Sequence, residues 1–91
     1  MMAYLIVCRD NENSLNKRLD NRSNHLEYLK RLGKKLILAG PILDKQGNPC
    51  GSILVLSITD RGDVDTFIKN DPYSKVNLFS KIEIINFKIV L

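Results

Sequence analysis

The chain contains one histidine, His25, and a carboxylate far along the sequence offers it a partner. Asp71 stands before Pro72, where a predicted helix must end. A carboxylate bonded to an imidazole fixes the tautomer of the ring and raises its basicity. The free ring nitrogen can then take or give a proton near neutral pH. A His25–Asp71 pair would therefore support general acid–base chemistry, whereas a histidine beside an apolar helix stripe is also a common structural residue, and both interpretations remain open.

Arg22 is the second residue whose position suggests chemistry. Projection of a helix at about 100° per residue gathers four leucines into one stripe: Leu15, Leu19, Leu26 and Leu29. Arg22 falls in the middle of this stripe. Since an unpaired buried guanidinium is costly, Arg22 needs a carboxylate or carbonyl partner, or it lines a cleft and binds an anionic or enolate oxygen. The alternative is that its stem covers the leucines and its head reaches water.

Motifs for other chemistries are absent from the sequence. The two cysteines, Cys8 and Cys50, lie 42 positions apart without a Cys-x-x-Cys pair, as expected for free thiols that pack in strands. Together with His25 they would still lack a fourth zinc ligand and the usual pairwise spacing. No glycine-rich phosphate loop or nucleophile elbow occurs. We therefore expect neither a metal nor a cofactor.

Length and composition describe a single small domain over residues 1–91. Hydrophobic residues make up 44% and charged residues 26%, which is typical of globular chains. The net charge of +4 is mild and dispersed, which argues against a nucleic-acid partner. No apolar run approaches the roughly 20 residues of a membrane span, and the apolar start lacks the basic region of a signal peptide. These features predict a cytoplasmic protein that does not bind membranes.

Hydrophobic periodicity and turn residues predict six elements in the order β-α-β-β-α-β. Strands are expected over residues 4–8, 36–39, 53–58 and 82–91, and helices over 14–32 and 60–70. Gly40-Pro41 should end the second strand, and residues 44–49 should form a hairpin turn. This order predicts a ferredoxin-like α+β fold, with a four-stranded antiparallel sheet and two helices on one face.

The strands also predict a partner for the sheet. The runs Leu5-Ile6-Val7, Leu36-Ile37-Leu38 and Ile53-Leu54-Val55-Leu56 are apolar on both faces. A sheet that is open to water on one side should alternate, and two helices can cover only one face. We therefore expect a homodimer whose sheets pack face to face.

Four short motifs in this order resemble the YciI-like, or YCII-related, family: Arg22-x-x-His25-Leu26, Ala39-Gly40-Pro41, Gly51-Ser52 and Asp71-Pro72-Tyr73. The resemblance covers nearly the whole chain and implies a ferredoxin-like fold that dimerises into an α+β barrel. It also implies that His25 and Asp71 do enzymatic work. Most members have no known function, but relatives resemble muconolactone isomerases, and one YciI-like dehydrochlorinase acts on a chlorinated hydroxyquinol.

One position departs from the family pattern. The glycine usual four residues after the tyrosine is Asn77 here, and Asn tolerates the positive φ that a glycine would supply. Two interpretations stay open for the other motif residues. Ser52 could donate to a bound oxyanion or hold Asp71, or it could only begin a strand. Tyr73 could line a pocket or pack on the first helix, and Gly40-Pro41 could face the cleft or only shape a turn.

Three functions follow from these observations. The first is a small cofactor-independent enzyme that uses His25 and Asp71 for isomerisation, lactone chemistry or HX elimination on a small oxo-acid, phenolic or lactone substrate. The second is a non-catalytic module that binds small ligands at a dimer interface. The third, RNA binding, is disfavoured because the predicted third strand carries no aromatic residue for base stacking.

Overall fold

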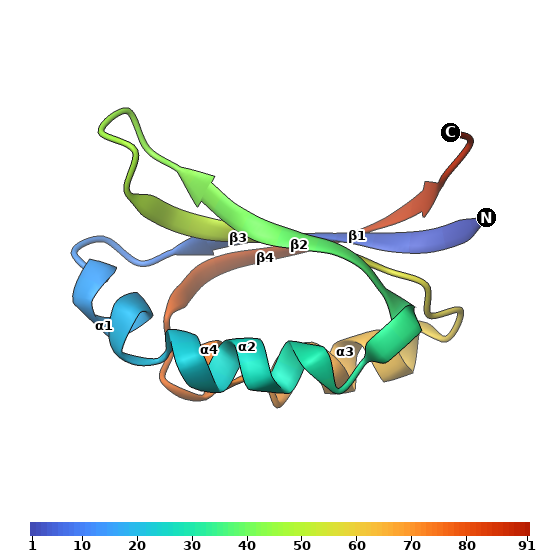
Figure 1. Ribbon diagram of the computed structural model, residues 1–91, viewed down its shortest axis with the longest axis horizontal. Coiled ribbons are helices and arrows are strands. Elements are labelled where there is room, and N and C mark those ends of the chain that lie inside the picture. Colours follow the sequence, from blue (N-terminus) through green and yellow to red (C-terminus); the bar gives the residue numbers. More distant parts are fainter.

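The computed structural model describes residues 1–91 as one sheet with helices on a single face (Figure 1). In chain order the elements are β1 (Met2–Asp10), α1 (Leu15–Asp20), α2 (Arg22–Lys30), the 3₁₀ helix η1 (Gly33–Lys35), β2 (Leu36–Leu43), β3 (Pro49–Leu56), α3 (Arg61–Lys69), α4 (Pro72–Lys75) and β4 (Phe79–Lys88). The strands are antiparallel in the order β2-β3-β1-β4. This arrangement confirms the predicted ferredoxin-like α+β fold. None of the helices combines the length and apolar character needed to span a membrane.

The hydrophobic core lies between the sheet and the helices. Alternation along β1 directs Ile6 and Cys8 to the helix side, where both are buried. Their neighbours in the core are Leu29, Leu54, Leu56, Val64 and Ile68. One small core thus holds α2 and α3 against the same face of the sheet.

The prediction of one continuous helix over residues 14–32 is wrong. The helix breaks at Asn21, where ψ is 4°, and the Asn21 side chain donates a hydrogen bond to the Lys17 carbonyl at 2.8 Å. Such side-chain bonds compete with the helix backbone. Because α1 is tilted relative to α2 (Figure 1), Arg18 is buried and Leu19 is 52% exposed, although the projection had placed Leu19 in the apolar stripe.

The strand boundaries also differ from the predicted ones. β2 continues through Gly40-Pro41 to Leu43, so these residues do not end the strand. Pro41 fits here because β2 is an edge strand, and a missing N–H on the unpaired side of such a strand costs no hydrogen bond to a neighbouring strand. β3 begins at Pro49 and ends at Leu56, and β4 occupies 79–88 rather than 82–91. The hairpin turn is confirmed, since the Asp44 carboxylate accepts the backbone N–H groups of residues 46 and 48.

The short helix α4 was not predicted, and it positions the carboxylate of interest. Asp71 is its N-cap and accepts the Tyr73 N–H at 2.9 Å, while Pro72 takes the first helical position. Asn77 then turns the chain toward β4 with φ of 56°, so the backbone expected of a glycine is retained. This tight sequence of cap, proline and turn places Asp71 and Tyr73 beside α2.

The face of the sheet opposite the helices is mostly apolar and uncovered in this chain, and its charged residues include Lys81 and Glu83 of β4. Ile53, Ile85 and Phe87 on this face are 36%, 42% and 40% exposed, and Leu38 on the edge strand is 51% exposed. The strands are therefore apolar on both sides, as the sequence predicted.

Candidate active site

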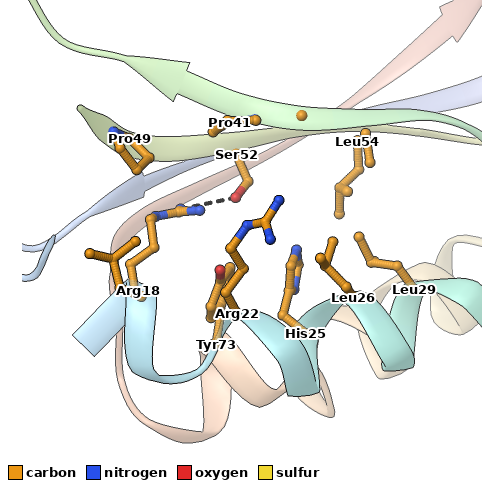
Figure 2. Close-up of a pocket in the computed structure, with 13 residues that line it drawn as sticks. Arg18, Arg22, His25, Leu26, Leu29, Pro41, Pro49, Ser52, Leu54 and Tyr73 are labelled. Carbon is orange, nitrogen blue, oxygen red and sulfur yellow. Dashed lines mark hydrogen bonds between the residues drawn. The ribbon is translucent and has the colours of Figure 1, made fainter. Parts of the chain in front are cut away.

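A cavity of about 190 Å³ opens between α1 and α2 on one side and β2 and β3 on the other (Figure 2). Much of its apolar surface comes from Leu26, Leu29 and Leu54. Six of the seven predicted site residues line it: Arg22, His25, Gly40, Pro41, Ser52 and Tyr73. Asp71 does not line the cavity, because it lies behind the imidazole of His25.

The structure brings His25 and Asp71 together across 46 positions of sequence. His25 Nδ1 lies 2.9 Å from Asp71 Oδ1, and the two side chains are 7% and 2% exposed. A carboxylate oxygen only accepts, so the shared proton sits on Nδ1 and the ring is held as the Nδ1–H tautomer. Nε2 then carries the lone pair. It has no hydrogen-bond partner in the protein and lies on the side of the ring that faces the cavity.

Tyr73 fixes the plane of the imidazole. Its ring stacks on His25 with centroids 3.9 Å apart and an angle of 14° between the planes. The Arg18 guanidinium lies 4.7 Å from the same ring, and Figure 2 shows Tyr73 between Arg18 and His25. Burial raises the pKa of Tyr73, and the charges of Arg18 and Arg22 only partly oppose this rise. Tyr73 is therefore a neutral, fully buried platform, and it both lines the cavity and packs on the helices.

Arg18 is the site residue that the sequence did not identify. Its Nε donates to Asp10 Oδ2 at 2.7 Å, and its Nη2 donates to Asp10 Oδ1 at 2.8 Å and to Ser52 Oγ at 2.9 Å. Burial alone would lower the pKa of Arg18, but the hydrogen bonds and charge of Asp10 raise it, so the group stays charged. Ser52 thus bonds Arg18 and does not hold Asp71. An acidic residue at the end of the first strand was the only signal in the sequence.

Arg22 is the cation at the cavity that no carboxylate neutralises. It is exposed and takes part in none of the ion pairs of the structure. Figure 2 shows its guanidinium between Ser52 and His25. Arg22 thus lines the cavity, and its exposure also fits the alternative in which its head reaches water.

Cys8 lies in the core close to the site, but its thiol is unreactive. It is 1% exposed, and burial, followed by the charge of Asp71, raises its pKa to about 12. Both cysteines are free, as predicted. The thiol of Cys8 therefore stays protonated at any physiological pH and does not act as a nucleophile at the site.

Comparison with known proteins places this chain in a family and finds solved structures with the same fold. The family model described as the YCII-related domain matches residues 2–88. The chain is 32% identical to the 5-chloro-2-hydroxyhydroquinone dehydrochlorinase of Burkholderia phenoliruptrix AC1100, which was solved with 2,5-dihydroxybenzoquinone. The match has a TM-score of 0.88 and covers 94% of this chain and 93% of that one. None of the curated proteins matches the chain.

More distant matches show the fold alone. A NIPSNAP family protein of Agrobacterium tumefaciens is 12% identical with a TM-score of 0.60, and the match covers 98% of this chain and 92% of that one. Protein Atu4242 of the same organism is also 12% identical with a TM-score of 0.60, over 99% and 94% of the two chains. These structures share the fold of the dimeric α+β barrel proteins.

Proposed function

Since this chain belongs to the YCII-related domain family, we propose that it is an enzyme in which His25 transfers a proton on a small cyclic substrate. The observation that carries this proposal is the buried His25–Asp71 pair with its second ring nitrogen on the cavity side. A solvated His–Asp contact would be unremarkable, but burial at a cavity is the setting in which acid–base groups operate.

In the proposed reaction His25 Nε2 takes a proton from a hydroxyl or from a carbon beside a carbonyl. Asp71 stabilises the imidazolium that forms, and Arg22 holds the oxygen on which negative charge develops. The electron pair left behind then has two fates. In an isomerisation it forms a new double bond and His25 returns the proton elsewhere on the same substrate. In an elimination it forms the double bond while a halide leaves with its own bonding pair, and His25 passes the proton to water.

The size of the cavity suits a substrate of about one ring. Engineered cavities of about 150 Å³ accept benzene, so about 190 Å³ accommodates a six-membered ring with a few oxygen substituents. The relative that is 32% identical was solved with such a ring, 2,5-dihydroxybenzoquinone. We therefore place hydroxylated hydroquinones and quinones ahead of open-chain oxo-acids and lactones. The backbone of Gly40 and the ring of Pro41 form part of the cavity wall and would set the shape of the accepted ring.

The test is turnover of a panel of halogenated hydroxyhydroquinones, small lactones and oxo-acids, followed by quinone absorbance and halide release. We expect His25→Ala to lower kcat about 10²- to 10⁴-fold, the usual range for loss of a positioned proton-transfer group. Asn24→Ala, which changes an exposed residue of the same helix outside the cavity, is the matched control. Full activity in His25→Ala would remove the proposed role. Tight binding of a panel member that is recovered unchanged would instead favour a non-catalytic binding module.

We also propose that two copies pair through the open face of the sheet. The exposed apolar side chains of this face include Ile53, Ile85 and Phe87, which are the kind of surface that monomeric proteins seldom leave uncovered. A second copy offers the same surface, so the contact would be self-complementary. The cytoplasm remains the compartment that the composition predicts.

A further inference from the structure

We propose that the Ser52 hydroxyl donates a hydrogen bond to an anionic oxygen of the ring substrate, and that the buried Asp10–Arg18 pair exists to aim it. The inference rests on the proposed substrate class and adds a recognition point to it. Ser52 would be the group that touches substrate. Asp10 and Arg18 would be positioning residues, because they act through Ser52.

The direction of the Ser52 hydroxyl follows from what it already accepts. Its Oγ receives the Arg18 Nη2–H at 2.9 Å, and a serine hydroxyl has only one hydrogen of its own to donate. No protein acceptor takes that hydrogen, whereas the side chain lines the cavity and is 3% exposed. A hydroxyl that accepts from a cation is also polarised toward stronger donation. The hydrogen is therefore available to a ligand oxygen in the cavity.

The guanidinium of Arg18 is held in this orientation by its other contacts. Its two bonds to Asp10 form a planar fork, and both side chains of the pair are 5% exposed. The cation contact with Tyr73 adds a further restraint on the guanidinium. A buried ion pair is a poor way to stabilise a small core, since apolar residues of similar volume do at least as well. Its presence beside the cavity is better explained by the hydroxyl that it orients.

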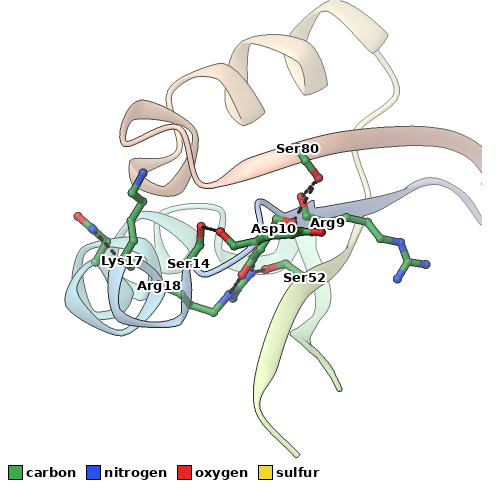
Figure 3. A network of polar contacts seen from close by, with 9 residues as sticks. Arg9, Asp10, Ser14, Lys17, Arg18, Ser52 and Ser80 are labelled. Carbon is green, nitrogen blue, oxygen red and sulfur yellow. Dashed lines mark hydrogen bonds and ion pairs between the residues drawn. The ribbon is translucent and has the colours of Figure 1, made fainter. Parts of the chain in front are cut away.

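Asp10 is itself fixed by an irregularity in the sheet. The pairing of β1 with β4 shifts register between Arg9 and Asp10, which leaves Ser80 as the extra residue of β4. The Ser80 hydroxyl lies 3.2 Å from the carbonyl oxygens of both Arg9 and Asp10 (Figure 3). Bulges of this kind often re-aim a side chain next to an active site. The chain of contacts thus runs from the bulge through Asp10 and Arg18 to Ser52.

Two cationic or donor groups then face the same region of the cavity. Arg22 is uncompensated and exposed, and Ser52 offers a directed hydrogen, while His25 Nε2 is an acceptor. A ring that fits all three carries one ionised oxygen for Arg22 and Ser52 and one hydroxyl for His25. This pattern describes the monoanion of a hydroxylated quinone or hydroquinone.

Binding of 2,5-dihydroxybenzoquinone, measured from its visible absorbance and by calorimetry, tests the inference. We expect Ser52→Ala to weaken binding at least tenfold, as loss of a hydrogen bond to a charged group does. Ser14→Ala is the matched control, because Ser14 is also a buried serine but donates to the Glu12 carbonyl outside the cavity. It should bind as the wild type does. Asp10→Asn keeps the shape of the pair and should weaken binding less than Ser52→Ala.

The positioning role is tested by a double-mutant cycle between Arg18→Lys and Ser52→Ala. Lysine cannot reproduce the fork and reach Ser52 together, so we expect the single change to weaken binding severalfold and the double variant to bind about as weakly as Ser52→Ala alone. Effects that multiply would overturn the positioning role. Wild-type binding in Ser52→Ala, or no binding of the probe by the wild type, would overturn the inference itself. The acid–base proposal fails separately, if His25→Ala retains turnover while Ser52→Ala weakens binding.

Discussion

Replacement of Asp71 tests two roles that one carboxylate oxygen performs. Asp71 Oδ1 accepts both the Tyr73 N–H and the His25 Nδ1–H, each at 2.9 Å. In Asp71→Asn the amide oxygen can take over both bonds. The opposite orientation would leave the buried Tyr73 N–H facing another N–H group. We therefore expect the amide to keep its oxygen in place and His25 to keep the Nδ1–H tautomer.

The expected cost of each substitution follows from these two bonds. Loss of a helix N-cap costs about 0.5–2 kcal/mol, and loss of a hydrogen bond to a charged group about 1.5–3 kcal/mol. Asp71→Ala should therefore lower the free energy of unfolding by about 2–5 kcal/mol. Asp71→Asn retains both bonds as neutral ones of about half the strength, so its cost should be about 1–2.5 kcal/mol. For a domain of this size, 1 kcal/mol corresponds to a change of about 4–8 °C in Tm.

Urea unfolding and long-range ¹H–¹⁵N correlation spectra of the ring give the two readouts. His25 is the only histidine, so its ring nitrogens are assigned without ambiguity. Lys69→Ala, an exposed change in the last turn of α3, is the control for the effect of mutating this end of the helix. Our reasoning is refuted if Asp71→Ala unfolds within about 0.5 kcal/mol of the wild type. It is also refuted if Asp71→Asn shows the Nε2–H tautomer.

Three further predictions concern the surroundings of the site. A Cβ on Gly51 would collide with the Cys8 carbonyl oxygen, so Gly51→Ala should push β1 and β3 apart. We expect this variant to lower Tm by more than about 5 °C and to weaken binding of the probe through Ser52. An unchanged Tm would argue against this packing. Because burial raises the pKa of Cys8 to about 12, iodoacetamide should modify only Cys50 in the folded protein at pH 8 and at pH 10, and Cys8 should react only after unfolding in urea, as mass spectrometry of peptides would show. Ile85→Lys on the open sheet face should convert a dimer into a soluble monomer in sedimentation experiments, and a wild-type protein that sediments as a monomer would contradict the proposed pairing.

The architecture was predictable because short-range patterns determine it. Apolar runs bounded by turn residues located the four strands, and the order of elements left few alternatives to a ferredoxin-like sheet. Asp60, predicted as the start of the second helix, is its N-cap and accepts the Gly62 N–H at 2.7 Å. Element boundaries failed where edge pairing overrode local signals. Pro41 looked like a strand end but lies inside an edge strand, where its missing N–H is tolerated.

The site was predictable only in part, and the reason lies in the helix break. A single helical projection through residues 14–32 placed Arg22 at the centre of the core-facing side. The break at Asn21 reorients α1, so the buried arginine is Arg18 and Arg22 sits at the cavity with its charge free. No proline or glycine marked this break. The contact of His25 with Asp71 likewise depends on α4, a four-residue helix too short to give a periodic signal.

The distribution of buried polar groups connects the fold to the proposed chemistry. Only 17 of the 91 residues are buried, and five of these are polar or charged: Ser14, Arg18, His25, Ser52 and Asp71. Four of the five belong to the cavity or directly support it. A domain this small is only marginally stable, and replacing a buried polar group by an apolar residue would often raise its free energy of unfolding. Their concentration on the two sides of one tyrosine ring is therefore expected if the site is functional, because each group is retained for what it does to its neighbour. Asp10 fixes Arg18, and Asp71 fixes His25. The Tyr73 ring therefore separates the residues proposed to recognise the substrate from those proposed to transfer the proton.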